Sequence, residues 1–273
     1  MIGKGIVLTA AHCVSKFGDG ATGFADKVYF IPAATKTANA GSSGPIGRWL
    51  AKDIVVPTCY INGTCKATSS SGVVTSNDLA IVILGGKKSK LPYRKGAGYY
   101  GYGWNGYGFT KGSEFASSKS MGEITQLGYP AAIGDKSTNR GGAMIRTDSM
   151  AMYSVPASGV KNLIWGSSQT GGASGGPQLV NFGNKPNYGS SASAGTNSLQ
   201  NILVGTTSWG YTDKALKVMG SSWFGTNTEF ASGSYKDDSG KDWGAGNIGA
   251  IMRFVCGSGK GYLDYQAKGW CRN

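Results

Sequence analysis

The chain has 273 residues, and its hydrophobic content of 40% is enough to bury a sizeable core, as one large β domain or as two halves that share an interface. An aromatic content of 11% excludes a disordered chain, and no run of about eighteen apolar residues exists that could span a membrane. The net charge of +13 leaves two interpretations open, a solvated surface with scattered charges or attraction to an anionic partner.

The first third of the chain predicts short strands separated by loops of Ser, Thr and Gly. The apolar, β-branched segments are 5–9, 27–33, 51–57 and 78–84. Residues 10–14 predict one helical turn, which would present His12 at the end of the first strand. The segments 35–44 and 67–76 are the connecting loops.

A Gly/Tyr/Trp-rich stretch, 93–112, separates this part from the rest, and we expect the first strand of the second half within it. It could also be a platform for sugars or peptides, but ordinary packing and turns are the favoured interpretation. The later predicted elements are a strand at 124–130, a hairpin at 142–154, a loop at 182–200, a strand at 202–209, a long insertion at 211–244 and a last strand pair at 245–254. Helical periodicity is nearly absent, so we expect an all-β protein divided into 1–92, a crossover at 93–122, and 123–273.

Five cysteines without metal-ligand spacing indicate disulfides and an oxidising compartment, so we expect a secreted or periplasmic protein. Cys59 and Cys65 flank a short turn, and Cys256 and Cys271 bracket what we interpret as a glycine-rich hairpin. Cys13 is left over.

The segment 169–177, Gln-Thr-Gly-Gly-Ala-Ser-Gly-Gly-Pro, places Ser174 on a glycine-rich loop. Small neighbours leave the hydroxyl open, and such a loop lets backbone N–H groups converge as an oxyanion hole requires. A serine hydroxyl needs a neighbouring base, and His12 is the only histidine. Asp78 would orient the imidazole, and Asp53, which also precedes an apolar run, is the alternative.

Three segments, in the order His, Asp, Ser, resemble the chymotrypsin/trypsin-like serine peptidases. They are Thr9-Ala10-Ala11-His12-Cys13, Ser76-Asn77-Asp78-Leu79-Ala80 and Gly172-Ala173-Ser174-Gly175-Gly176. Gly128-Tyr129-Pro130, followed by Gly142-Ala143-Met144, is similar to the bacterial, glutamyl-endopeptidase-like members. The resemblance implies two six-stranded Greek-key β-barrels and a secreted serine endopeptidase that acts through an acyl-enzyme. It implies a protein or peptide substrate, a monomer, no metal and no cofactor.

The resemblance also assigns roles around the triad. It implies that the N–H groups of Gly172 and Ser174 form the oxyanion hole, and that 208–210, Ser208-Trp209-Gly210, pairs with the substrate backbone. Ser168 would lie at the floor of the specificity pocket, where it gives no countercharge to Lys or Arg. No second histidine exists to bind glutamate, so an apolar or small side chain is expected. Ala173 stands where the animal enzymes carry an activating aspartate, so that activation step is doubtful here.

In the family, the cysteine after the histidine pairs with one further upstream, and this chain enters on what would be the third strand of the first barrel. We therefore expect an incomplete first barrel and a longer natural protein. The alternative is that Cys13 is a free buried thiol.

The rival function is an inactive, protease-like binding or adhesion module. We expect no nucleic-acid partner, because the densest basic segment, 87–95, comes with no nucleic-acid-binding motif. The acidic segment 237–242 could bind calcium, but a solvated turn is the simpler interpretation.

Overall fold

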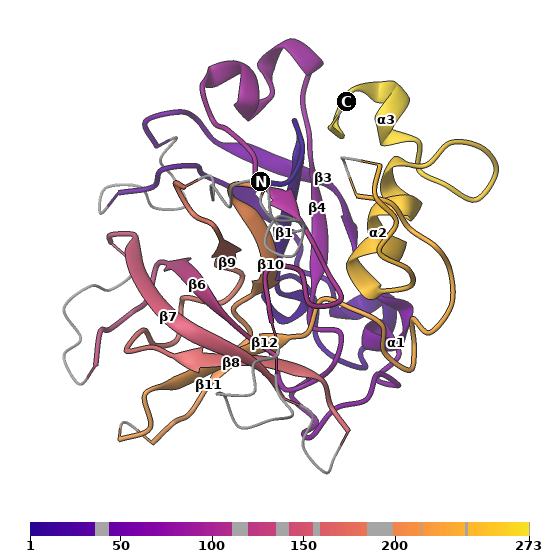
Figure 1. Ribbon diagram of the computed structural model, residues 1–273. Coiled ribbons are helices and arrows are strands. Elements are labelled where there is room, and N and C mark those ends of the chain that lie inside the picture. The colour runs from indigo at the N-terminus through magenta and orange to yellow at the C-terminus, as the bar shows by residue number, and fades with distance from the viewer. Residues whose placement is uncertain are drawn as a thin grey trace, which may run out of the picture.

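A computed structural model describes residues 1–35, 44–110, 120–134, 142–154, 159–184, 199–213, 215–237 and 240–272. Two β-sheets dominate it, one built from the first third of the chain and the other from the remainder (Figure 1). The expected mostly-β class with two halves is confirmed. The division at 92 and 122 stays a prediction.

The first sheet has four strands in the order β1-β4-β3-β2. They are β1 (Ile6–Thr9), β2 (Tyr29–Phe30), β3 (Trp49–Val55) and β4 (Ala80–Leu84). β1 pairs antiparallel with β4, from Ile6 opposite Ile83 to Thr9 opposite Ala80. Every residue of β4 is buried, which explains its continuous apolar run. This pairing places the residue after β1 and the residue before β4 at the same edge of the sheet.

The second sheet has eight strands in the order β11-β12-β8-β7-β6-β9-β10-β5. They are β5 (Gly101–Tyr102), β6 (Met121–Gly128), β7 (Ile145–Ser154), β8 (Asn162–Gly166), β9 (Pro177–Val180), β10 (Ile202–Thr206), β11 (Trp209–Gly210) and β12 (Val218–Ser222). The short β5 lies in the aromatic crossover, as expected, and pairs parallel with β10. The described strands number four in the first half, where fewer than six were expected, and eight in the second half, where six were expected.

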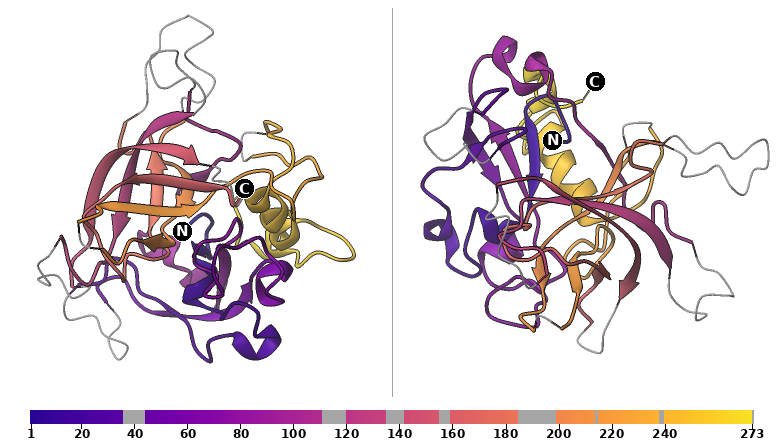
Figure 2. Two further views of the ribbon diagram at one scale, coloured as in Figure 1. Left: turned by 90° about the horizontal axis from the view of Figure 1, so that it is seen from below. Right: turned by 90° about the vertical axis from the view of Figure 1, so that its left-hand side faces the viewer.

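The predicted last strand pair at 245–254 is wrong, because this segment is the helix α2 (Asn247–Cys256). Its buried apolar residues Ile248, Ile251, Met252 and Val255 recur at helical spacing. They join the core cluster that contains β1 and β4 side chains, so α2 covers the first sheet (Figure 2). Consequently the two halves share one core.

Three other predictions need correction. The hairpin at 142–154 is one long strand, β7, which pairs with β6 on one side and β8 on the other. The insertion at 211–244 contains β12, which lies between β11 and β8. The cysteines 256 and 271 bracket a turn and the short helix α3 (Tyr265–Lys268), where a hairpin was expected. Other short helical elements are α1 (Thr58–Ile61) and 3₁₀ turns at Ala11–Cys13, Gly20–Gly23, Lys88–Lys90 and Pro92–Lys95.

Both expected disulfides are present, Cys59–Cys65 beside α1 and Cys256–Cys271 between α2 and the C-terminal end. Cys13 is a free thiol, and it is exposed where burial was the alternative. None of the helices in the described ranges has the length and apolar character that a membrane crossing requires.

Candidate functional site

His12 and Asp78 meet at the edge shared by β1 and β4. The 3₁₀ turn Ala11–Cys13 follows β1 directly, and Asp78 lies two residues before β4. His12 Nδ1 lies 2.7 Å from Asp78 Oδ2, and the His12 backbone N–H donates to Asp78 Oδ1 over 2.8 Å. Two contacts to one carboxylate fix the ring orientation and place a proton on Nδ1, so Nε2 is the ring nitrogen that faces away from Asp78.

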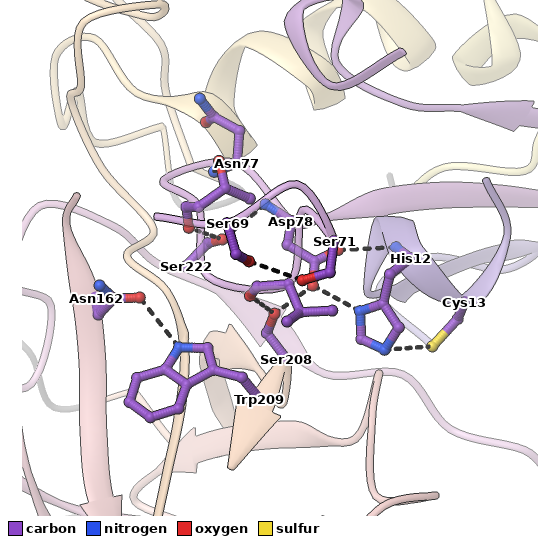
Figure 3. A network of polar contacts seen from close by, with 12 residues as sticks. His12, Cys13, Ser69, Ser71, Asn77, Asp78, Asn162, Ser208, Trp209 and Ser222 are labelled. Carbon is purple, nitrogen blue, oxygen red and sulfur yellow. Dashed lines mark hydrogen bonds and ion pairs between the residues drawn. The ribbon is translucent and has the colours of Figure 1, made fainter. Parts of the chain in front are cut away.

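The Asp78 carboxylate is fully buried and is bound from the second sheet as well (Figure 3). The Ser208 hydroxyl, just before β11, donates to Asp78 Oδ2. The Asp78 backbone N–H donates to Ser222 Oγ over 2.7 Å, and Ser222 is the last residue of β12. Both halves of the fold therefore hold this aspartate in place. The Ser208 hydroxyl and the two N–H groups of His12, which bind the carboxylate itself, compensate for the cost of burying its charge.

The alternative orienter, Asp53, lies elsewhere. Its side chain is on the exposed face of β3, and it accepts a hydrogen bond from the Tyr265 hydroxyl of α3. Both Asp53 and Asp78 precede apolar runs, but the fold brings only Asp78 into contact with His12.

Cys13 contacts the other nitrogen of the ring. Its Sγ lies 3.7 Å from His12 Nε2, and among the described residues no hydrogen bond joins that nitrogen to Ser174. Burial disfavours the charged imidazolium, but hydrogen bonds and electrostatic attraction from Asp78 and Cys13 outweigh it and raise the pKa of His12 to about 10. The ring therefore carries a second proton at neutral pH in this arrangement.

Cys13→Ala is expected to lower the pKa of His12, because it removes the thiol's attraction and leaves the Asp78 pair intact. Since the chain has one histidine, an NMR titration of its imidazole reports this site alone. The midpoint should move from about 10 toward lower pH. An unchanged midpoint would contradict the electrostatic role of Cys13.

The same shift predicts how stability depends on pH. A folded-state pKa above the ordinary 6.5 means that protonated His12 stabilises the fold. That contribution is complete below pH 6.5 and is lost as pH rises through about 10. Urea unfolding across this window should show a steeper alkaline loss in the wild type than in Cys13→Ala.

The Ser174 loop packs against the end of β1 at Thr9, three residues before His12. A Cβ on Gly175 would lie 2.2 Å from Thr9 Oγ1, and φ there is +78°. The Gly175 N–H also donates to Thr207 O over 2.7 Å, next to the serine that binds Asp78. Glycine at 175 thus permits the close approach of the Ser174 loop to the end of β1, the strand that precedes His12.

Two backbone donors beside Ser174 have no acceptor. Among the described residues, neither the Gly172 N–H nor the Ser174 N–H donates a hydrogen bond. Gly172 has φ +94°, and a Cβ there would lie 2.9 Å from Tyr129 O. This left-handed turn is strained for other residues. The loop therefore offers the pair of donors that an oxyanion hole needs.

The arrangement of the two sheets is similar to that of known serine proteases. AL20, a thermostable serine protease from an extremophilic microorganism, has a TM-score of 0.56 and 21% identity over 81% of this chain and 80% of that one. The protease Anisep from Arthrobacter nicotinovorans has a TM-score of 0.55 and 24% identity over 82% of this chain and 79% of that one.

The chain has the chymotrypsin-like serine protease fold. No protein-family model and no curated protein matches its sequence. At these identities the likeness establishes the fold alone.

In this protease-like fold, Ser174 borders two cavities. One, of about 550 Å³, is lined by Ser168, Ser208, Trp209 and Gly210, the four residues predicted to bind substrate. Ser168 is exposed to this cavity, whereas the neighbouring Ser167 is buried. The other cavity, of about 670 Å³, runs along β1. A peptide substrate bound across Ser174 would therefore find a cavity on each side of the serine.

Sequence reasoning missed Met219 and Ser222, because β12 was interpreted as part of an insertion. Met219 lines the smaller cavity opposite Gly210, is 5% exposed, and accepts a hydrogen bond from the buried Gln126 amide at its sulfur. Neither residue belongs to a motif, so only strand pairing identifies them.

The described residues contain one group with metal-ligand geometry, Cys59, Cys65 and Glu229. Both sulfurs are joined in a disulfide, so they offer no thiolates to a metal. In the acidic turn considered for calcium, Asp237 binds the Lys241 N–H and the Trp243 indole. Residues 238 and 239 of that turn lie outside the described residues.

Proposed function

We propose that the protein is a serine endopeptidase that cleaves peptide bonds with Ser174, His12 and Asp78. The observation that carries the proposal is the buried Asp78 carboxylate, bound to His12 Nδ1 at 2.7 Å, beside a glycine loop that carries Ser174. A buried carboxylate is costly unless it is paired. A histidine oriented in this way is suited to act as the base of a serine nucleophile on that loop.

In the proposed reaction, His12 Nε2 removes the proton of the Ser174 hydroxyl as its oxygen attacks the substrate carbonyl. This requires Nε2 to leave Cys13 Sγ, its present contact. The negative oxygen of the tetrahedral intermediate accepts hydrogen bonds from the Gly172 and Ser174 N–H groups. The imidazolium then donates its proton to the leaving amine, and water hydrolyses the acyl-enzyme by the same route.

The substrate backbone pairs with the segment 208–210, and the side chain before the cleaved bond enters the cavity lined by Ser168. Asp213 and Lys217 both border that cavity, so it presents no single excess charge to attract Lys, Arg or Glu. Met219 adds an apolar side chain to its lining. These features favour substrates with a small or apolar side chain before the cleaved bond. Mass spectrometry of a peptide library digested by the protein would identify the residues at which cleavage occurs.

Two disulfides support a protein that works in an oxidising compartment, secreted or periplasmic, and we propose that it acts as a monomer. The similarity to the glutamyl-endopeptidase-like members stays a prediction.

The test is a fluorophosphonate probe, which reacts with serines that an adjacent base activates. Peptide mapping should place the adduct on Ser174, with labelling that increases as His12 loses its proton. Folded protein that is not labelled at any pH up to about 10, the pKa of His12, would overturn the proposal and favour a binding module.

A further inference from the structure

A cluster of three buried asparagines lies directly behind Asp78. Asn77, the residue before it, is fully buried, and so is Asn247 at the start of α2; Asn227 is 6% exposed. Asn77 Oδ1 accepts hydrogen bonds from Asn227 Nδ2 at 2.8 Å and from Asn247 Nδ2 at 3.1 Å. Side chains 150 and 170 residues away in sequence therefore hold the residue next to the carboxylate.

The amide group of Asn77 is occupied on its donor side too. Its Nδ2 donates to Glu229 Oε2 over 3.1 Å and lies 3.4 Å from Asn227 Oδ1. Since both ends of the amide are bound, the Asn77 side chain has one orientation, and the peptide that leads into Asp78 has little freedom to move.

Asn247 also binds the backbone of two other segments. Its Nδ2 lies 3.2 Å from Ser76 O and 3.1 Å from Trp223 O, and its Oδ1 accepts the Gly225 N–H over 3.1 Å. One side chain thus links α2, the segment after β12, and the loop 76–77. The same loop receives a second support from Ser222, whose hydroxyl accepts the Asp78 N–H and donates to Thr75 O.

We propose that Asn247 is a positioning residue: through Asn77 it holds Asp78 at hydrogen-bond distance from His12, so that α2 braces the site from the far side of the shared core. The inference rests on the proposed function, because it assigns Asp78 to orienting the base. The His12–Asp78 pair has a 2.7 Å contact, and a displacement of the loop by a fraction of an ångström would weaken it.

The experiment compares wild type, Asn247→Ser, Asn247→Ala and a control, Asn105→Gly. A serine can still accept an N–H at the start of the helix, as capping hydroxyls do, but cannot reach Asn77. Asn105 donates to Trp243 O and Ala245 O over 2.7 and 2.9 Å, in the segment before α2, and its Oδ1 accepts the Thr226 N–H over 2.8 Å. Its φ of +53° suits glycine. The control therefore loosens the same region, including the residue before Asn227, without removing a hydrogen bond made by Asn77 or Asn247.

Two readouts are measured on folded protein: the imidazole pKa and Nδ1–H resonance of the single histidine by NMR, and the rate of fluorophosphonate labelling. We expect both Asn247 variants to lower the His12 pKa and the labelling rate, the latter by about 10- to 100-fold, the range of a small misplacement. Asn105→Gly should change neither.

Folded Asn247 variants with the wild-type pKa and Nδ1–H resonance would overturn the inference. If Asn105→Gly moves both readouts equally, general loosening explains the effect and the inference is also overturned. If wild type is never labelled but the Asn247 variants still shift the His12 resonance, the proposed function fails and the positioning role stands.

Discussion

Ser174→Ala is expected to reduce kcat for peptide hydrolysis by about 10⁴- to 10⁶-fold, with little change in KM. The variant loses the nucleophile, so no acyl-enzyme forms, whereas the oxyanion donors and both cavities persist. The residual rate over water would come from these donors and from binding. Steady-state kinetics on a peptide substrate identified by library digestion, together with loss of probe labelling, measures the effect.

The matched control is Ser71→Ala, since Ser71 is an exposed serine of the loop that leads to Asp78 and bonds only Ser69 among the described side chains. It should keep wild-type kinetics. The serine assignment is wrong if Ser174→Ala keeps more than a tenth of the wild-type activity while remaining folded, because another group must then attack the carbonyl.

Asp78→Asn is expected to lower kcat by about 10⁴-fold. The carboxylate accepts hydrogen bonds from the His12 backbone, His12 Nδ1 and the Ser208 hydroxyl. An asparagine amide has one acceptor oxygen, and its NH₂ group can only donate. When this NH₂ group faces His12 Nδ1, the ring adopts the tautomer in which Nδ1 is the acceptor and Nε2 carries the proton, which is the wrong tautomer for a base. The downfield Nδ1–H resonance of the single histidine should disappear together with the activity.

Asp53→Asn is the control for this prediction, because Asp53 also precedes an apolar run and bonds Tyr265 at a distance from His12. It should retain full activity. Equal losses in the two variants, or a loss below tenfold in Asp78→Asn, would show that Asp78 does not orient the base.

Much of the candidate site could be predicted from the sequence because the chemistry limits the choice of residues. A chain with one histidine has one imidazole base, and a serine in a Gly-Gly-Ala-Ser-Gly-Gly segment is recognisable in any fold. The short strands of the first sheet were also predictable, because burial on both faces gives β4 a continuous apolar run.

Helix α2 was missed although its apolar residues have helical spacing. The helix has only ten residues, and glycines lie next to it. In so short a segment, the apolar pattern of a helix cannot be distinguished from that of two short strands. What decides for the helix is the apolar face of the first sheet, which α2 covers through Ile248, Ile251 and Met252.

By itself, the sequence determined the residue types of the site, the probable cysteine pairs and the mostly-β class, because each depends on local composition and spacing. Only the tertiary structure decided between Asp78 and Asp53, placed Met219 in a cavity and joined Asn247 to Asn77. Those facts depend on which segments, up to 170 residues apart, the shared core brings within hydrogen-bond distance. Local patterns carry no information about such contacts.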